Sequence, residues 1–348
     1  MKQRSLMKRV SAVLMAATLT ISAFPQFHTN VHAAENQVLT KEQFATAEEL
    51  KTFDTNDQNG KNPAKVYFGN NDQQWWIAGS QNGNLTLFAA SPLERSVQFN
   101  PNRDEREYNG QTVNANHYGA SDIKKTVKNL ETSYFTGTEQ DLMNDTTIYT
   151  NDGKNNSVYS SVNKLYLAYG DYYDNKYITV GTNSQDSLNN GLRVDMDYWG
   201  NSLFWLRAPS MHYSYYALAA NPGYDVTADR VNYGNALVPA FELNLLSVLF
   251  ASAAPAATST GDLTLQDTDG DGAFTFRYKS ENLGSALVSY DKSKVTLTNV
   301  PNGTYLVVQN SSQAKAKQIT SETEVSATDM GLDSFATVSY THLRAHET

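Results

Sequence analysis

The segment from Phe204 to Leu245 constrains the fold of this chain most, because apolar runs typical of strands alternate there with turn residues. Three strands are predicted in it. Phe204–Leu206 is short and apolar, and Pro209 ends it, since proline cannot donate a hydrogen bond to a sheet ladder. Tyr216–Ala220 is the second strand, and a proline–glycine turn follows it. Ala236–Leu243 is predicted as a third, buried strand.

The polar connections between these strands supply the candidate ligand-binding residues. Tyrosine and serine together are typical of adaptable binding surfaces, because rigid amphipathic rings combine with small hydrogen-bonding groups. Burying all three tyrosines of Met211–Tyr216 would require three hydroxyl partners in one short connection, which is costly. We therefore predict that Tyr213, Tyr215 and Tyr233 lie on one exposed patch, with Trp205 and Phe241 in the core. The predicted ligand-binding residues are Tyr213, Tyr215, Tyr216, Tyr224, Asp225, Asn232, Tyr233 and Asn235. The alternative is that the tyrosines only cover the end of the sheet.

Four short motifs carry a resemblance to a known family: Trp75-Trp76-Ile77, Tyr134–Gln140, Trp205-Leu206-Arg207-Ala208-Pro209 and Val238-Pro239-Ala240-Phe241. On these motifs the chain from about Val66 to Leu245 resembles a family of uncharacterised secreted bacterial domains, domain of unknown function 6273. Members usually have serine where Ala208 stands and Val-Arg where this chain has Leu237-Val238. The resemblance implies an architecture similar to C-type lectins and an exported protein, and it implies no established activity.

Composition excludes several classes of function. The chain has 348 residues, enough for two domains, and no cysteine, which excludes disulfides, zinc–thiolate sites and thiol nucleophiles. Its formal net charge is −9. An acidic chain is a poor partner for nucleic acid, because binding to the phosphate backbone depends on clustered lysine and arginine. The same negative charge disfavours binding to anionic lipid.

Residues 1–33 are predicted to be a secretory signal peptide. Four basic residues precede an apolar stretch, Val10–Phe24, that is too short for a comfortable membrane span. Val31-His32-Ala33 has small or compact residues at the positions that a signal peptidase reads. Its removal would leave 23 basic against 36 acidic residues, a net charge of −13, and no membrane span. Export without cysteine fits an extracellular or cell-wall-associated protein of a Gram-positive bacterium. The alternative is a membrane anchor.

The predicted fold class is α+β. A C-type-lectin-like mixed domain of antiparallel sheets with two short helices is followed by a small, all-β, immunoglobulin-like sandwich. Ser121 is expected to cap the first helix, Ala120–Leu130, and the second covers Thr138–Met143. The predicted order is a signal peptide (1–33), a polar segment with one helix, Lys41–Phe53 (34–64), the lectin-like domain (65–250), a linker (251–260), the β-sandwich (261–338) and a non-native tail (339–348).

One motif is typical of a metal site. Asp267, Asp269 and Asp271 place carboxylates at alternate positions before a glycine, as at the start of a calcium loop. Position twelve of an EF-hand requires a bidentate glutamate, and Tyr278 stands there, so an ordinary EF-hand is excluded. Two interpretations stay open: an incomplete calcium loop with other ligands, and an acidic β-turn. No other cofactor is expected.

The sequence gives little evidence for a set of catalytic residues. Outside the leader and the tail the histidines are His117 and His212, and a lone loop histidine is more often an ordinary residue than a catalyst. Asp195 and Asp197 are compatible with glycosidase chemistry, but two acids in an acidic chain mean little. We expect Arg207 to be partly buried and to clamp strands together rather than bind a ligand, since a buried guanidinium needs carboxylate or carbonyl partners.

These observations favour a secreted, non-enzymatic recognition module that binds an extracellular glycan or protein through aromatic and asparagine-rich loops. Two alternatives remain. The first is a structural spacer or adhesin-stalk component of the bacterial envelope, and the second, more distant, is a glycan-active hydrolase.

Overall fold

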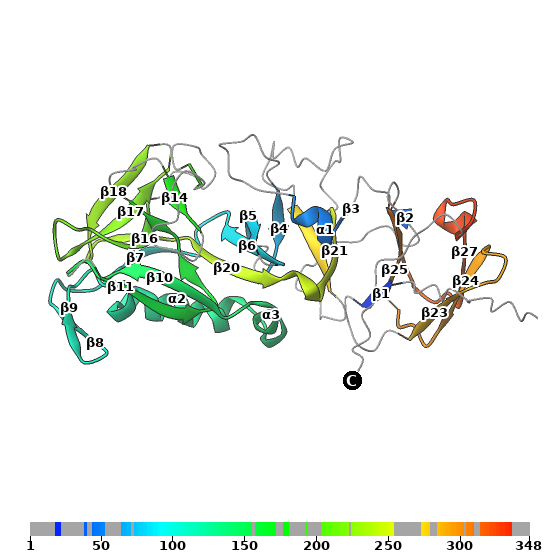
Figure 1. Ribbon diagram of the computed structural model, residues 1–348, viewed down its shortest axis with the longest axis horizontal. Helices are drawn as coiled ribbons and strands as arrows, with labels where there is room; N and C mark the ends of the chain where they lie inside the picture. Colours follow the sequence, from blue (N-terminus) through cyan, green and yellow to red (C-terminus); the bar gives the residue numbers. More distant parts are fainter. Residues whose placement is uncertain are drawn as a thin grey trace, which may run out of the picture. The chain divides into compact units, whose positions relative to one another are not determined.

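The computed structural model describes residues 18–21, 38–39, 44–52, 64–70, 73–81, 83–154, 157–171, 177–180, 192–193, 203–222, 224–253, 273–278, 284–302, 304–309 and 314–335 (Figure 1). These residues form mainly antiparallel β-sheets with few helices. The chain divides into two compact units. The larger unit comprises Pro25–Val31 and Glu42–Arg277, and the smaller unit comprises Met1–Phe24, His32–Lys41 and Tyr278–Thr348.

The larger unit contains an eight-stranded sheet in the order β12-β20-β6-β5-β4-β22-β21-β3. Its strands are β3 (Phe44–Thr46), β4 (Lys65–Tyr67), β5 (Gln74–Gln81), β6 (Asn84–Ala89), β12 (Tyr166–Leu167), β20 (Pro239–Asn244), β21 (Val248–Ala253) and β22 (Ala273–Tyr278). β4 and β22 are parallel. β20 lies between β12 and β6, so the C-terminal end of the segment Phe204–Leu245 has a paired strand on each side.

The other strands of the segment Phe204–Leu245 belong to a five-stranded sheet, in the order β18-β17-β16-β19-β7. Its strands are β7 (Glu94–Gln98), β16 (Phe204–Pro209), β17 (Tyr216–Asn221), β18 (Asp225–Arg230) and β19 (Gly234–Leu237). β16 runs parallel to β19 and antiparallel to β17. Figure 1 shows β20 extending away from this sheet toward β21.

The segment therefore contains five strands where three were predicted. The third predicted strand, Ala236–Leu243, is interrupted at Val238 and contributes to two different sheets. β18 was interpreted as turns, because half-exposed polar residues dominate it and Val226 is its one fully buried side chain. Pro209 is the last residue of β16 and pairs with Ala217 after a register shift, so the strand ends there as the proline predicts.

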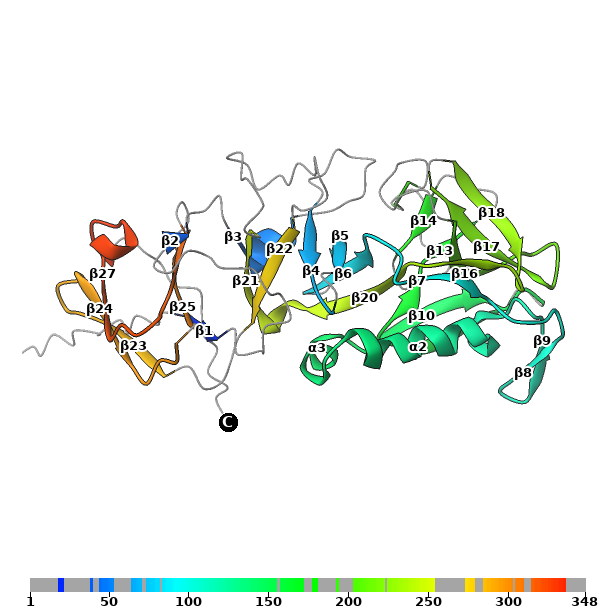
Figure 2. The ribbon, with the colours of Figure 1, turned by 180° about the vertical axis from the view of Figure 1, so that it is seen from behind.

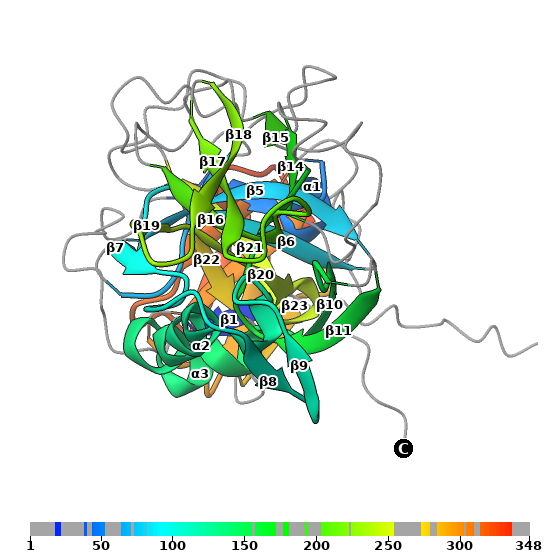
Figure 3. The same cartoon turned by 90° about the vertical axis from the view of Figure 1, so that its left-hand side faces the viewer.

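Both predicted helices of the larger unit are present. α2 (Asp122–Tyr134) begins after Ser121, whose hydroxyl accepts a hydrogen bond from the Lys124 backbone N–H as an N-cap. Its buried residues, Ile123, Val127 and Leu130, follow the predicted helical spacing. α3 (Gly137–Leu142) begins with a capping box between Thr136 and Glu139. The two helices lie next to each other on one side of the larger unit (Figures 2 and 3).

The core of the larger unit is aromatic. Trp75 is fully buried, its ring centroid lies 4.8 Å from that of Phe241, and its indole N–H donates to the Phe68 carbonyl at 2.8 Å. Trp205 is also fully buried and donates to the Val97 carbonyl at 2.7 Å. Both indoles satisfy their polar group inside the core, which allows full burial. The predictions that Trp205 and Phe241 pack in the core are confirmed.

Smaller sheets complete the larger unit. β13 (Tyr169–Gly170), β14 (Tyr177–Thr179) and β15 (Leu192–Arg193) form a three-stranded sheet, and the hairpins are β8 (Arg106–Tyr108) with β9 (Gln111–Val113) and β10 (Thr146–Asn151) with β11 (Val158–Asn163). The β8–β9 hairpin extends from the body of the unit (Figures 1 and 2). Sequence periodicity does not indicate this hairpin, since short charged strands carry little hydrophobic signal.

Two boundaries differ from the sequence-based expectation. The predicted helix Lys41–Phe53 is shortened to α1 (Ala47–Leu50), because Phe44–Thr46 pairs with β21 as strand β3. The predicted linker, 251–260, begins inside β21, and Ala273–Tyr278, expected in the sandwich, pairs with β4 of the larger unit instead. The backbone partners of these strands are distant in sequence, so local composition did not reveal them. The predicted tail, 339–348, lies outside the described residues.

The smaller unit has two antiparallel sheets, in the orders β1-β25-β26-β2 and β23-β24-β27. Their strands are β1 (Thr18–Ile21), β2 (Val38–Leu39), β23 (Ser285–Val288), β24 (Lys294–Thr298), β25 (Thr304–Gln309), β26 (Ala314–Gln318) and β27 (Glu324–Ser326). One hydrophobic cluster joins Val295 of β24 to Leu306 of β25, so the two sheets share a core. β1 lies within the predicted signal peptide, most of which is outside the described residues.

Helices long and apolar enough to cross a membrane are absent from the described parts of the chain.

Candidate functional site

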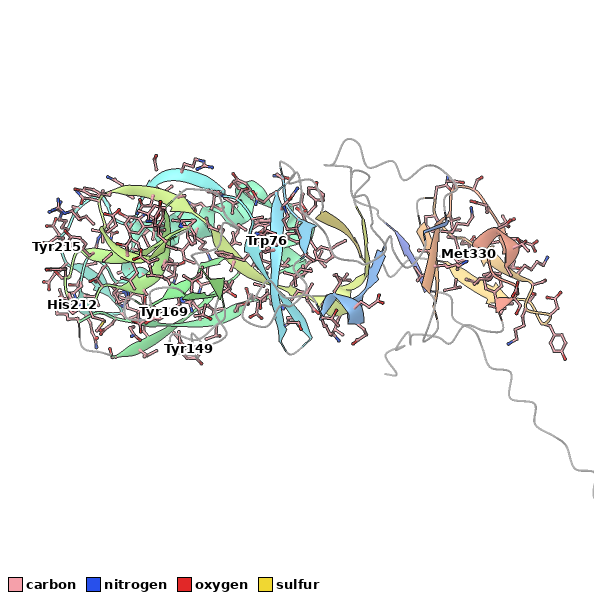
Figure 4. The ribbon with its side chains drawn as sticks, turned by 90° about the horizontal axis from the view of Figure 1, so that it is seen from above. Trp76, Tyr149, Tyr169, His212, Tyr215 and Met330 are labelled. Atoms are coloured by element: carbon pink, nitrogen blue, oxygen red, sulfur yellow. The ribbon has the colours of Figure 1, made fainter. Side chains whose placement is uncertain are left out.

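The candidate site lies at one end of the five-stranded sheet. Tyr216, the first residue of β17, pairs with Arg230, the last residue of β18. The connection that precedes β17 and the turn that follows β18 therefore meet at the same sheet end. Figure 4 shows Tyr215 and His212 at one end of the larger unit, away from Trp76.

Three tyrosine rings form the centre of this site. The ring centroid of Tyr216 lies 5.1 Å from that of Tyr215 and 5.2 Å from that of Tyr213, at interplanar angles near 45°. Tyr213 is 58% exposed, and the other two are half-buried. Tilted rings at these separations stabilise one another while leaving ring faces open to solvent.

Arg230 connects this cluster to the next turn. Its Nε donates to the Tyr216 hydroxyl at 2.9 Å, and its Nη1 donates to the Tyr233 hydroxyl at 3.0 Å. The guanidinium also lies over both rings, at 5.9 and 5.5 Å from their centroids. The hydrogen bond to Tyr216 raises the pKa of Arg230 above its usual value. Tyr233 is 47% exposed and thereby joins the same surface.

Arg103 completes the surface from a distant part of the chain. Its guanidinium lies 5.2 Å from the Tyr215 ring centroid, and its Nε donates to Asn232 Oδ1 at 3.2 Å. The tyrosine–arginine face is defined as the set Arg103, Tyr213, Tyr215, Tyr216, Arg230, Asn232 and Tyr233. Two guanidinium groups thus flank the Tyr215–Tyr216 pair.

Asn116 fixes the backbone beneath this face. This buried side chain places Nδ2 within 2.8–3.1 Å of three carbonyl oxygens, those of Ser210, Tyr213 and Tyr216. Its backbone N–H donates to the Ser214 carbonyl at 3.1 Å. A single asparagine therefore holds the whole connection between β16 and β17 in one conformation.

The structure brings together five of the eight predicted binding residues: Tyr213, Tyr215, Tyr216, Asn232 and Tyr233. Tyr224 and Asp225 lie at the opposite end of the β17–β18 hairpin, where Asp225 pairs with Asn221, roughly 16 Å along the strands from Tyr216. Asn235 is buried and donates to Asp229 Oδ2 at 3.1 Å, so it supports β19 instead of facing a ligand. Sequence proximity had suggested one face for all eight.

Three residues of the site were missed by the sequence analysis. Arg103, Arg230 and Asn116 are not among the predicted binding residues. Asn116 lies 94 to 100 residues from the carbonyls that it contacts. No local pattern encodes such a contact. For Arg230 a signal existed, since an arginine placed between tyrosines in a Tyr-rich segment favours cation–π pairing.

Arg207 clamps strands together, as predicted. It is fully buried, its Nη1 donates to the Leu167 carbonyl at 2.7 Å, and its Nε donates to the Tyr149 carbonyl at 3.4 Å. Leu167 lies on β12 and Tyr149 on β10, so the guanidinium connects strands of two different sheets. Burial lowers the pKa of Arg207 to about 10, and it stays charged at neutral pH.

His117 is packed among aromatic rings. It is 1% exposed, stacks on Tyr159 with ring centroids 4.1 Å apart, and its Nδ1 accepts from the Ala120 backbone N–H at 3.2 Å. Burial lowers its pKa to about 4, so the imidazole is neutral at pH 7. The side chain does not reach the surface, which fits a structural role. His212 is exposed and lies near the tyrosine–arginine face.

Within the described residues, no three histidine or acidic side chains converge in a way that could hold a metal ion. The carboxylates that raised metal or glycosidase chemistry in the sequence lie outside the described residues: Asp195, Asp197, Asp267, Asp269 and Asp271.

Comparison of the chain with protein-family models, with curated proteins and with solved structures finds no match.

Proposed function

We propose that the larger unit is a recognition module of a secreted, cell-surface protein and binds an extracellular glycan or protein through the tyrosine–arginine face, without catalysis. The observation that carries this proposal is the fixed backbone beneath the exposed rings. Asn116 contacts the carbonyls of Tyr213 and Tyr216, so the backbone that carries these rings is held before a ligand arrives. A pre-organised aromatic surface binds with a smaller loss of conformational freedom than a mobile loop.

The same proposal includes the finer fold and the compartment. The larger unit is a C-type-lectin-like domain related to domain of unknown function 6273, and the smaller unit is an immunoglobulin-like sandwich. The Trp205–Pro209 and Val238–Phe241 motifs support the first assignment, and the two sheets with a shared core support the second. The basic and apolar N-terminal residues support export.

A paired-variant experiment tests the proposed function. The double substitution Tyr213→Ser with Tyr215→Ser should abolish binding of the wild-type ligands on a glycan array and to a cell-surface protein extract, because it removes two adjacent rings. The melting temperature should stay within a degree or two, since Tyr213 is exposed and Tyr215 is not part of the buried core. Tyr224→Ser removes an exposed ring at the far end of the hairpin and should leave binding unchanged.

Two outcomes contradict the proposal. A double variant that fails to fold would show that the rings are structural covers of the sheet end. A folded wild-type protein that binds neither glycans nor surface proteins would favour a spacer or stalk component.

A further inference from the structure

The two arginines of the tyrosine–arginine face have neutral partners. Arg230 donates to the hydroxyls of Tyr216 and Tyr233, and Arg103 donates to the amide oxygen of Asn232. Neither guanidinium forms an ion pair with a carboxylate in the described part of the chain. By contrast, Arg106 is held by Asp122 at 3.0 Å. The positive charge of this face is therefore not neutralised by a direct contact.

The nearest acid on β18 is engaged elsewhere. Asp229 Oδ1 accepts from the Arg230 backbone N–H at 2.8 Å, and its Oδ2 accepts from the Asn235 side chain at 3.1 Å. Both oxygens thus stabilise the turn that presents Arg230. The guanidinium itself has five N–H donors, of which two are used by tyrosine hydroxyls, so three remain for a ligand.

This arrangement is unusual for an acidic chain. The protein carries a formal charge of −9, which disfavours non-specific adhesion of polyanions. On this face, two guanidinium groups without an ion-pair partner among the described residues lie beside exposed rings, so the local charge is positive although the chain is acidic. Arginine is well suited to bind carboxylates, because its planar fork matches both oxygens. The exposed faces of Tyr213 and Tyr233 offer the apolar contact that sugar rings require.

We propose that the tyrosine–arginine face binds an acidic polysaccharide, with Arg103 and Arg230 contacting carboxylates of uronate residues and the exposed tyrosine rings stacking on the sugar rings between them. This inference rests on the proposed function and names its ligand class. Asn232 is turned toward Arg103 by its side-chain oxygen and holds that arginine over Tyr215. Contacts run from Arg103 to Tyr215, from Tyr215 to Tyr216 and from Tyr216 to Arg230, so a pair of rings lies between two positive charges, which suits a polymer of charged sugar rings.

Binding of defined polymers to the full-length protein tests the inference. Polygalacturonate supplies sugar rings with carboxylates, its methyl ester supplies the same rings without charge, and polyglutamate supplies carboxylates without sugar. We expect calorimetry to show binding of polygalacturonate and at least about tenfold weaker binding of both control polymers. Binding should also weaken as salt rises from about 50 to about 300 mM, because the contacts are exposed to solvent.

Variants locate the binding on this face. Arg103→Gln and Arg230→Gln should each weaken polygalacturonate binding by about tenfold. Arg230→Lys retains the charge but loses the fork, and should give an intermediate value. Lys128→Gln removes one exposed charge from α2 and should change nothing, which controls for net charge. Melting curves of all variants establish that each is folded.

Several results would overturn the inference while leaving the proposed function intact. If the methyl ester binds as tightly as polygalacturonate, the carboxylates are not recognised. If polyglutamate binds as tightly, the sugar rings are not recognised. Loss of binding in the tyrosine double variant with full binding in both arginine variants would also overturn the inference. Absence of any ligand for the wild-type protein, on the array and with these polymers, would refute both.

Discussion

Acidification should destabilise the larger unit through His117. The pKa of this histidine is lowered from 6.5 to about 4 by burial, so between these values the unfolded chain binds a proton that the folded chain does not. The stabilisation is complete above pH 6.5 and is lost as the pH falls toward 4. One such group costs about 2 kcal/mol of unfolding free energy between about pH 7 and about pH 5. Nearby Asp152 reduces this effect and Lys124 adds to it.

Urea denaturation at a series of pH values measures this loss. The four tryptophans, Trp75, Trp76, Trp199 and Trp205, all lie in the larger unit, so their fluorescence reports on that unit. His117→Gln removes the titrating group, and its unfolding free energy should depend less on pH than that of the wild type by about 2 kcal/mol over the same interval. The comparison uses the pH dependence of the unfolding free energy, so the pH-independent loss of packing in the variant does not affect it.

The control is His212→Gln, at an exposed histidine, which should retain the wild-type dependence. Glu242 responds in the opposite direction, because burial raises the pKa of its carboxyl, but its contribution is the same in all three proteins. If the His117 variant keeps the full wild-type slope, the buried imidazole does not carry the effect and the reasoning is refuted.

Three further outcomes are expected. Ser121→Ala removes the N-cap of α2 and should lower the unfolding free energy by about 1 kcal/mol in urea denaturation, and an unchanged midpoint would contradict the role of the cap. Trp75→Ala should cost about 3–5 kcal/mol, because the ring is fully buried, whereas Tyr224→Ala should stay within about 0.5 kcal/mol; similar losses would contradict the assigned burial. Millimolar calcium should raise the melting temperature of the protein if the loop with Asp269 binds the ion, and Asp269→Ala should abolish this gain. An unchanged wild-type curve would leave the acidic-turn interpretation.

Local features of this fold were predictable from the sequence. The N-cap and the apolar spacing of α2 act within a few residues, so the helix was located to within a turn at its C-terminal end. The burial of Trp205 and Phe241 followed from large apolar side chains on strands. The exposure of Tyr213 before β17 followed from the cost of burying several hydroxyls together, whereas Tyr215, also predicted to be exposed, is half-buried.

The composition of the site was only partly predictable. Sequence proximity grouped Tyr224 and Asp225 with the tyrosines before β17, yet the hairpin places them at its opposite end. Strand pairing decides which ends of a segment meet, and pairing depends on partners elsewhere in the chain. For the same reason β18 was overlooked and the division between β19 and β20 was not foreseen.

The sequence by itself determined a β-rich chain without cysteine chemistry, two short helices of which Ser121 caps the first, an aromatic core and a tyrosine-rich connection, because each of these depends on residue type or on neighbours within a few positions. The tertiary structure alone decided that Arg103 lies over Tyr215 and that Asn116 holds the backbone beneath. These contacts join residues about a hundred positions apart, and only the packing of distant strands brings them within hydrogen-bonding distance.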